Sequence, residues 1–154
     1  MTRFPAITDL VPHRAPLLQV ERVLGLVDDT VSVAMTVRAD SIFVADGLLP
    51  AWTGIELMAQ AIAAYAGLEA LARGEPVRKG FLLGTRDYRA HVPAIAVGTE
   101  LVLTAHPLYR EDSGLGSFDC RIKDGERVLI EARLNVFEPP DFEAFIAQRD
   151  AGTP

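Results

Sequence analysis

Glu56 is the residue of this sequence best placed to do chemistry. It is the only charged residue between Asp46 and Glu69, and most of its neighbours are apolar. Gln60 follows four residues later, so on a helix it would share a face with Glu56 and could donate a hydrogen bond to the carboxylate. Burying a lone carboxylate is costly, and carboxylates held in apolar pockets are a recurring catalytic device. We therefore treat Glu56 as a candidate catalytic group.

Glu56 also has a purely structural interpretation. Thr53 precedes it by three residues, and this spacing matches the capping box of a helix N-terminus. In that motif the glutamate merely satisfies a backbone amide. The residues by themselves leave both interpretations open.

The three histidines are the candidate proton acceptors, because an imidazole titrates near neutral pH. His13 lies in a corner flanked by Pro12 and Pro16, which fix the backbone around it. His91 follows the end of an expected strand, and His106 lies within another. Each ring could equally be a structural group with satisfied hydrogen bonds. We rank His13 first and His91 second.

The positive charge is unevenly distributed along the chain. Five of the 15 lysines and arginines fall within residues 73–89, namely Arg73, Arg78, Lys79, Arg86 and Arg89. The whole chain has 21 acidic residues and a net charge of −6. On an acidic protein such a cluster could steer an anionic partner, or it could be a solvated strand and loop.

Missing motifs exclude several reaction classes. The sequence contains no phosphate-binding Gly-x-x-x-x-Gly-Lys-Ser/Thr loop, no Gly-x-Ser-x-Gly elbow and no His-Glu-x-x-His helix. The stretch 114–116 lacks the third glycine of a dinucleotide fingerprint. The histidines are too far apart to suggest a metal site by spacing. We therefore expect no metal. A pI near 5.0 means a net negative charge at neutral pH, which is the wrong sign for a nucleic-acid-binding protein, so we expect no nucleic acid.

The composition predicts a cytoplasmic protein. Cys120 is the single cysteine, so no internal disulfide can form, and we interpret it as a small core residue. We see no signal peptide at the start of the sequence. The longest apolar tract, 57–68, is shorter than the roughly 20 residues that span a bilayer, so we expect no membrane association.

The order of expected elements predicts an α+β fold. With 154 residues the chain is one domain, residues 1–154, with its core at about 4–138 and a tail at 139–154. Residues 50–73 form the one long helical pattern, apolar all round and followed by Gly74 as a cap. Residues 38–49 are expected to be a loop, and 141–150 a short amphipathic helix. The expected strands are 17–26, 31–37, 79–88, 100–108, 117–122 and 128–137, with hairpin turns at 28–30 and 124–125.

An antiparallel sheet wrapped around one long central helix is the architecture that this order favours. Its edge strands would be unprotected in a monomer, so we expect a dimer.

Several stretches resemble a known family. Residues 10–18 (LVPHRAPLL) and 20–23 are similar to the opening motif of FabZ-type 3-hydroxyacyl-[acyl carrier protein] dehydratases. Pro50 and then 56–61 (ELMAQA) resemble the start of their central helix. The stretches 84–88, 91–93, 117–122 and 131–137 are closer still to the ApeP-type dehydratases of aryl polyene biosynthesis.

The resemblance implies a hotdog fold and dehydration of 3-hydroxyacyl thioesters carried on acyl carrier protein. A histidine from one subunit would remove the α-proton, and a carboxylate from the partner, here Glu56, would help expel the β-hydroxyl as water. No cofactor is implied beyond the carrier's phosphopantetheine. We expect Gly84, Gln60 and Trp52 to contact the substrate. The carrier would bind at Arg78 and Lys79.

One departure from the family pattern leaves the base open. FabZ-type proteins carry their catalytic histidine shortly before the central helix, whereas 41–49 contains none, and Asp46 is its only ionisable residue. His13, His91 or a partner subunit could supply the base. The alternatives to the enzyme are a non-catalytic hotdog subunit that binds carrier protein or completes a partner's site, and a hotdog thioesterase. The partner would be a second copy or another hotdog protein.

Overall fold

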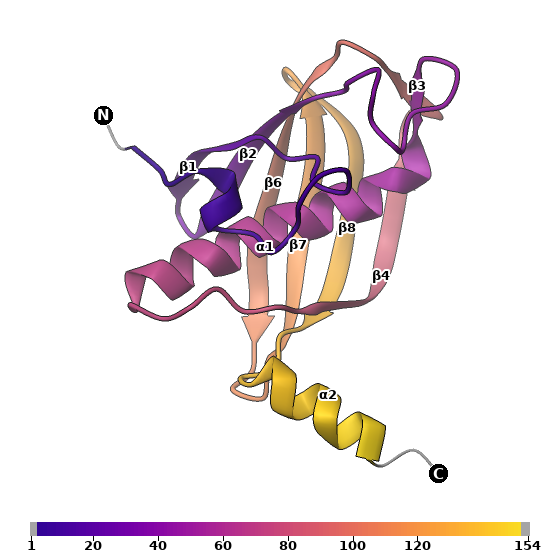
Figure 1. Ribbon diagram of the computed structural model, residues 1–154. Helices are drawn as coiled ribbons and strands as arrows, with labels where there is room; N and C mark the ends of the chain where they lie inside the picture. The colour runs from indigo at the N-terminus through magenta and orange to yellow at the C-terminus, as the bar shows by residue number, and fades with distance from the viewer. Residues whose placement is uncertain (1–2, 152–154) are drawn as a thin grey trace.

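The computed structural model describes residues 3–151 and shows a curved antiparallel sheet wrapped around one helix (Figure 1). The six-stranded sheet has the order β1-β2-β6-β7-β8-β4, and every neighbouring pair is antiparallel. Its strands are β1 (Arg22–Val27), β2 (Thr30–Thr36), β6 (Glu100–Arg110), β7 (Leu115–Asp124), β8 (Arg127–Phe137) and β4 (Phe81–Ala90). The α+β hotdog prediction is confirmed.

The central helix, α1 (Gly54–Ala72), crosses the concave face of this sheet (Figure 1). Ten of its 19 residues are buried. Residues 51–72 form a helical run with the length and hydropathy of a membrane span, and half of its most apolar window is buried inside the domain. Its packing against β2, β6, β7 and β8 identifies α1 as the core helix of the domain.

The helix begins later than the sequence predicts. Residues Ala51–Thr53 form a 3₁₀ turn, and α1 proper starts at Gly54. The Thr53 hydroxyl donates to the Pro50 carbonyl and makes no capping bond, so the capping-box interpretation of Glu56 was wrong. At the other end, Gly74 adopts a φ of 67°, as expected for a residue just beyond a helix C-terminus.

The turns and short elements agree with the sequence to within a few residues. Asp28 and Asp29 both adopt positive φ between β1 and β2, as a two-residue hairpin requires. The second turn lies one residue later than predicted, at 125–126. The expected loop 38–49 ends in a three-residue strand, β3 (Leu48–Pro50), which pairs with the unpredicted β5 (Ala94–Ala96). The tail forms α2 (Phe142–Ala151), as expected.

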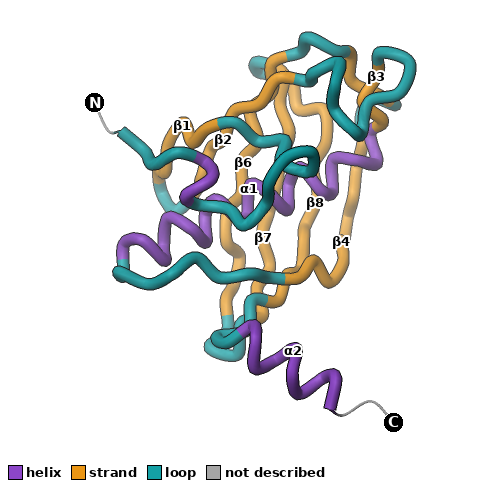
Figure 2. Tube along the Cα trace, in the orientation of Figure 1, coloured by secondary structure: helices purple, strands orange, loops and turns teal. Residues whose placement is uncertain are grey.

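Two segments of the chain without long regular structure pass close to α1. After α1 the chain returns alongside the helix as a loop before it enters β4 (Figure 2). The N-terminal segment, including a 3₁₀ turn at Ile7–Asp9, crosses the outer side of α1. Residues of both segments line the cavity described below, together with residues of α1.

The close approach of the N-terminal segment depends on Gly67. A Cβ atom at this position would lie 2.1 Å from the carbonyl oxygen of Leu10. The atoms that this Cβ would meet belong to the backbone of Leu10, so no rotation of a side chain can relieve the clash. The glycine therefore fixes the distance between the helix and the segment that carries His13.

We predict that Gly67→Ala destabilises the protein by about 1–3 kcal/mol, the usual cost of overpacking. A loss of stability would be informative, because helix propensity alone favours alanine over glycine in a helix interior by about 1 kcal/mol. Urea unfolding followed by circular dichroism measures the change. Gly25→Ala is the control, since a Cβ there meets nothing within 4 Å. A Gly67→Ala variant as stable as the parent would contradict the packing.

Candidate active site

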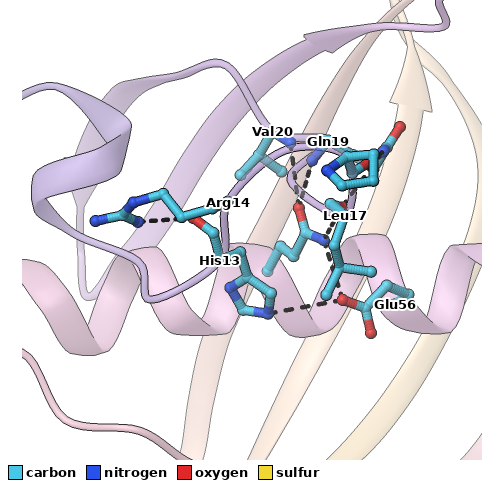
Figure 3. A network of polar contacts seen from close by, with 8 residues as sticks. His13, Arg14, Leu17, Gln19, Val20 and Glu56 are labelled. Carbon is cyan, nitrogen blue, oxygen red and sulfur yellow. Dashed lines mark hydrogen bonds and ion pairs between the residues drawn. The ribbon is translucent and has the colours of Figure 1, made fainter. Parts of the chain in front are cut away.

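A cavity of about 480 Å³ lies between α1, the N-terminal corner, residues 78–82, the end of β8 and the start of α2. His13 and Glu56 both line it. Their side chains come from segments 43 residues apart, and the fold brings them together at the wall formed by α1 (Figure 3). The structure therefore unites the two residues that the sequence ranks highest.

The two ionisable groups face each other without touching. His13 Nε2 lies 3.6 Å from Glu56 Oε1, beyond the range of a good hydrogen bond. The side chains are 20% and 30% exposed, respectively, because both open onto the cavity. A substrate could therefore contact either group directly, and proton exchange between them needs only a small movement.

Arg14 holds the backbone of the corner that carries His13. Its guanidinium donates hydrogen bonds to the carbonyls of Val11, His13 and Thr8 at 2.7–2.9 Å. These three bonds cross-link the residues on both sides of Pro12. The position of the imidazole is thus set by a side chain to which the sequence analysis gave no role.

Gln60 joins this corner to the helix. Its Oε1 accepts from the backbone amides of Gln19 and Val20, and its Nε2 donates to the Leu17 carbonyl. Nε2 also donates to Glu56 Oε1 at 3.0 Å, the bond that the spacing suggested. Gln60 is fully buried and does not line the cavity, so here it positions Glu56, and contact with substrate stays a prediction.

Burial decides the charge state of His13. Desolvation lowers the pKa of the imidazole below its ordinary value of 6.5, the Glu56 carboxylate opposes that shift, and Arg14 adds to it. Nδ1 is buried and has no hydrogen-bond partner among the described residues. The ring is therefore neutral at neutral pH, the form that can accept a proton.

The other two histidines lie outside the cavity. His91 Nε2 lies 3.0 Å from Glu131 on the exposed surface, and this contact lowers the pKa of the Glu131 carboxyl. His106 Nδ1 pairs with the Thr30 hydroxyl at 2.9 Å between neighbouring strands. Asp46 is exposed in a turn with a φ of 53°. The structure brings none of these three to Glu56.

The expected substrate and carrier contacts divide into two groups. Trp52 is 69% exposed, and Gly84 lies in β4 beside a register shift; neither lines the cavity. Arg78 and Lys79 do line it, but both already have partners within the chain. Arg78 pairs with Glu75 at 2.9 Å, and the Lys79 ammonium lies 5.6 Å from the centre of the Phe142 ring.

Sequence reasoning missed the aromatic part of the wall. Phe81, Phe137 and Phe142 line the cavity and come from β4, β8 and α2. Two of these three segments were expected as strands, but nothing in their spacing shows that α2 packs against them. Among residues 3–151, no group of three or more histidine, cysteine or acidic side chains could hold a metal ion.

Comparison with known proteins identifies a family and solved structures to which this chain is similar. The family model described as ApeP-like, ApeP dehydratase, matches residues 5–147. The chain is similar to a solved structure described as the dehydratase heterocomplex ApeI:P from Xenorhabdus doucetiae, with 35% identity and a TM-score of 0.86 over 94% of this chain and 98% of that chain. Among curated proteins no sequence matches.

More distant structures share the fold alone. A hypothetical thioesterase with coenzyme A from Streptococcus pneumoniae is 17% identical, with a TM-score of 0.56 over 76% of this chain and 84% of that one. AziG from S. sahachiroi is 18% identical, with a TM-score of 0.57 over 77% and 90%. Identities this low carry the architecture and no activity.

We predict that the His13 imidazole titrates below pH 6.5 and that Glu56→Gln lowers its pKa further. The carboxylate is the one group that raises the pKa of His13, so its removal leaves burial and Arg14 unopposed. Carbon-detected or proton–carbon NMR of the histidine rings follows the titration, with the exposed ring of His91 as an internal reference. A higher His13 pKa in the variant would show that the two groups do not interact as the structure places them.

Proposed function

The chain belongs to the family of ApeP-like dehydratases, and from this membership we propose that it converts 3-hydroxyacyl thioesters, carried on acyl carrier protein, to trans-2-enoyl thioesters. The observation that carries the proposal is the pair of His13 and Glu56 facing one apolar cavity. A β-elimination of water needs one group to accept a proton and one to donate a proton. These two side chains can supply both.

In the first step His13 accepts the α-proton. The α-carbon of a thioester is acidified by its carbonyl, and a neutral imidazole is the appropriate base near neutral pH. Burial keeps His13 unprotonated before the step. The accepted proton would bind Nε2, the nitrogen that faces Glu56.

In the second step Glu56 passes a proton to the β-hydroxyl, which leaves as water. The Cα–H electrons form the new double bond as the Cβ–O bond breaks. The proton that Glu56 passes on is the one that His13 accepted, transferred from Nε2 to Oε1, so both side chains end in the protonation state in which they began. The Gln60 amide keeps the Glu56 oxygen at the required place throughout.

This assignment places acid and base in one chain. The FabZ-type resemblance implies a histidine and a carboxylate from different subunits, with the histidine just before the helix. Here the corner at 12–16 provides a histidine that reaches the glutamate of the same chain. We infer that this arrangement replaces the histidine that segment 41–49 lacks.

A second candidate function is favoured by the partner of a relative. The similar Xenorhabdus doucetiae structure is a heterocomplex of two components. A chain of this family could therefore act as the subunit that completes a partner's site. Dehydration by the purified chain alone supports the enzyme, whereas dehydration only after addition of a second hotdog protein supports the accessory role. Release of free acid instead of an enoyl product would identify a thioesterase.

We predict that Glu56→Gln and His13→Ala each lower kcat by about 10²–10⁴-fold, the usual contribution of a general acid or base. Glutamine preserves the volume and can still accept the Gln60 hydrogen bond, so the fold should be retained. The matched controls are His91→Ala and His106→Ala, whose rings lie outside the cavity. Loss of water is followed at the enoyl thioester chromophore.

Full turnover in a folded Glu56→Gln variant would refute the catalytic assignment. Loss of activity in His91→Ala, with normal turnover in His13→Ala, would move the base to His91.

The edge strands support the proposed association with a second hotdog subunit. β4 has a neighbour on one side only, and none of its ten residues is buried. Leu83 on β4 is 56% exposed. Unpaired backbone groups and apolar side chains on an edge of this length favour pairing with another strand.

We predict that the chain forms a dimer, with a second copy or with another hotdog protein, and that no stable monomer is present at micromolar concentration. Sedimentation velocity of the chain alone, and of the chain co-expressed with a hotdog partner, separates these cases. Replacing Leu83 by lysine should weaken the association, and the same change at Leu108, exposed on β6, is the control. A well-behaved, active monomer would contradict the prediction.

A further inference from the structure

The distal wall of the cavity is made by α2. Phe142 is the residue that α2 contributes to the lining, whereas His13 and Glu56 belong to the N-terminal corner and α1. In Figure 1 α2 extends from the end of β8, beyond the loop that runs alongside α1. The reacting pair and the Phe142 ring thus belong to different walls of the same cavity.

The Phe142 ring is held by two contacts. It stacks on Phe81, with ring centroids 5.2 Å apart and an interplanar angle of 20°. The Lys79 ammonium lies over the ring at 5.6 Å, within the range of a cation–π interaction. A side chain fixed in this way is a rigid boundary.

A separate residue anchors the helix itself. Phe145, one turn after Phe142, packs against Phe81 and Phe137 at 5.6 and 5.2 Å. Phe145 is not among the residues that line the cavity. Phe145 therefore contributes to the docking of α2 without forming part of the boundary of the cavity.

The chemistry between the two walls suits a hydrocarbon chain. Most of the side chains there are apolar, including Ala59, Ile62, Ala63, Ala66, Leu82 and Val136. Ala59, Ala63 and Ala66 share the helix face of Glu56, because they follow it by 3, 7 and 10 residues. The last of them lies about 15 Å from Glu56 along the helix axis. A pantetheine arm would leave its amides without partners along such a surface.

We propose that Phe142 is a specificity-determining residue that ends the acyl-binding part of the cavity and so limits the length of the acyl group. This inference rests on the proposed function, because it takes the ligand to be an acyl thioester that reacts at His13 and Glu56. It assigns the end of the cavity at Arg78 and Lys79 to the acyl tail. The carrier would then approach from elsewhere, since both cations are engaged within the chain.

The test measures binding without catalysis. S-alkyl pantetheine thioethers of increasing alkyl length can be neither dehydrated nor hydrolysed, and calorimetry gives their affinities for the full chain. Affinity should rise with each methylene and stop rising at the length where the chain meets Phe142. Phe142→Ala should move this limit to longer chains, and a chain one step too long for the parent should bind about tenfold more tightly. Phe142→Trp should move the limit to shorter chains.

Phe145→Ala is the matched control and should keep the parent's limit, since its ring does not line the cavity. An unchanged limit in both Phe142 variants would overturn the proposal. So would an equal shift in Phe145→Ala, which would assign the effect to the docking of α2. Equal weakening of every thioether by Phe142→Ala would also overturn it, because it would place the pantetheine arm or carrier at this end.

Failure of the proposed function is seen separately. A parent protein that dehydrates no 3-hydroxyacyl thioester, yet shows the shifted limit in Phe142→Ala, would refute dehydration and keep the role of Phe142. A parent that dehydrates its substrate, combined with an unchanged limit in Phe142→Ala, would support dehydration and refute the role of Phe142.

Discussion

The buried side-chain amide of Gln60 is the interaction on which the geometry of the candidate site depends. A glutamine amide has two donor hydrogens and two acceptor lone pairs, and burial is costly unless they are used. Gln60 uses all four: two backbone amides donate to its oxygen, and its nitrogen donates to Leu17 and to Glu56. One side chain therefore fixes both the N-terminal corner and the carboxylate relative to α1.

This constraint explains why a histidine so distant in sequence lies beside Glu56. The corner is held against the helix by Gln60, from within by Arg14, and at a minimum distance by Gly67. These contacts are made mostly to backbone atoms of the corner and of the residues on either side of it. His13 is then placed by its position in the chain, and the pair with Glu56 needs no residue from a second subunit.

The sequence predicts those parts of the molecule that depend on local pattern. The all-round apolar helix followed by Gly74, and strands whose buried and less buried residues alternate, as in β6, follow from periodicity. Glu56 and Gln60 are paired by helical spacing alone. The capping-box match was misleading because a 3₁₀ turn precedes α1 and redirects the Thr53 hydroxyl, a change that no residue pattern announces. The three-residue strands β3 and β5 are too short to produce a period, and the docking of α2 is set by aromatic contacts across three elements.

The electrostatics of the pair formed by His13 and Glu56 connect this packing to the proposed dehydration. The desolvation that lowers the pKa of His13 comes from the same close packing of corner and helix that positions the ring, so geometry and basicity are set together. A base with a depressed pKa is mostly unprotonated at neutral pH, at the cost of a weaker affinity for the proton that it must accept. Glu56 offsets part of that cost, because its carboxylate raises the pKa of the His13 imidazole and so opposes the effect of burial. The lowered pKa of His13 then favours release of the accepted proton, so the burial that prepares the base also resets it.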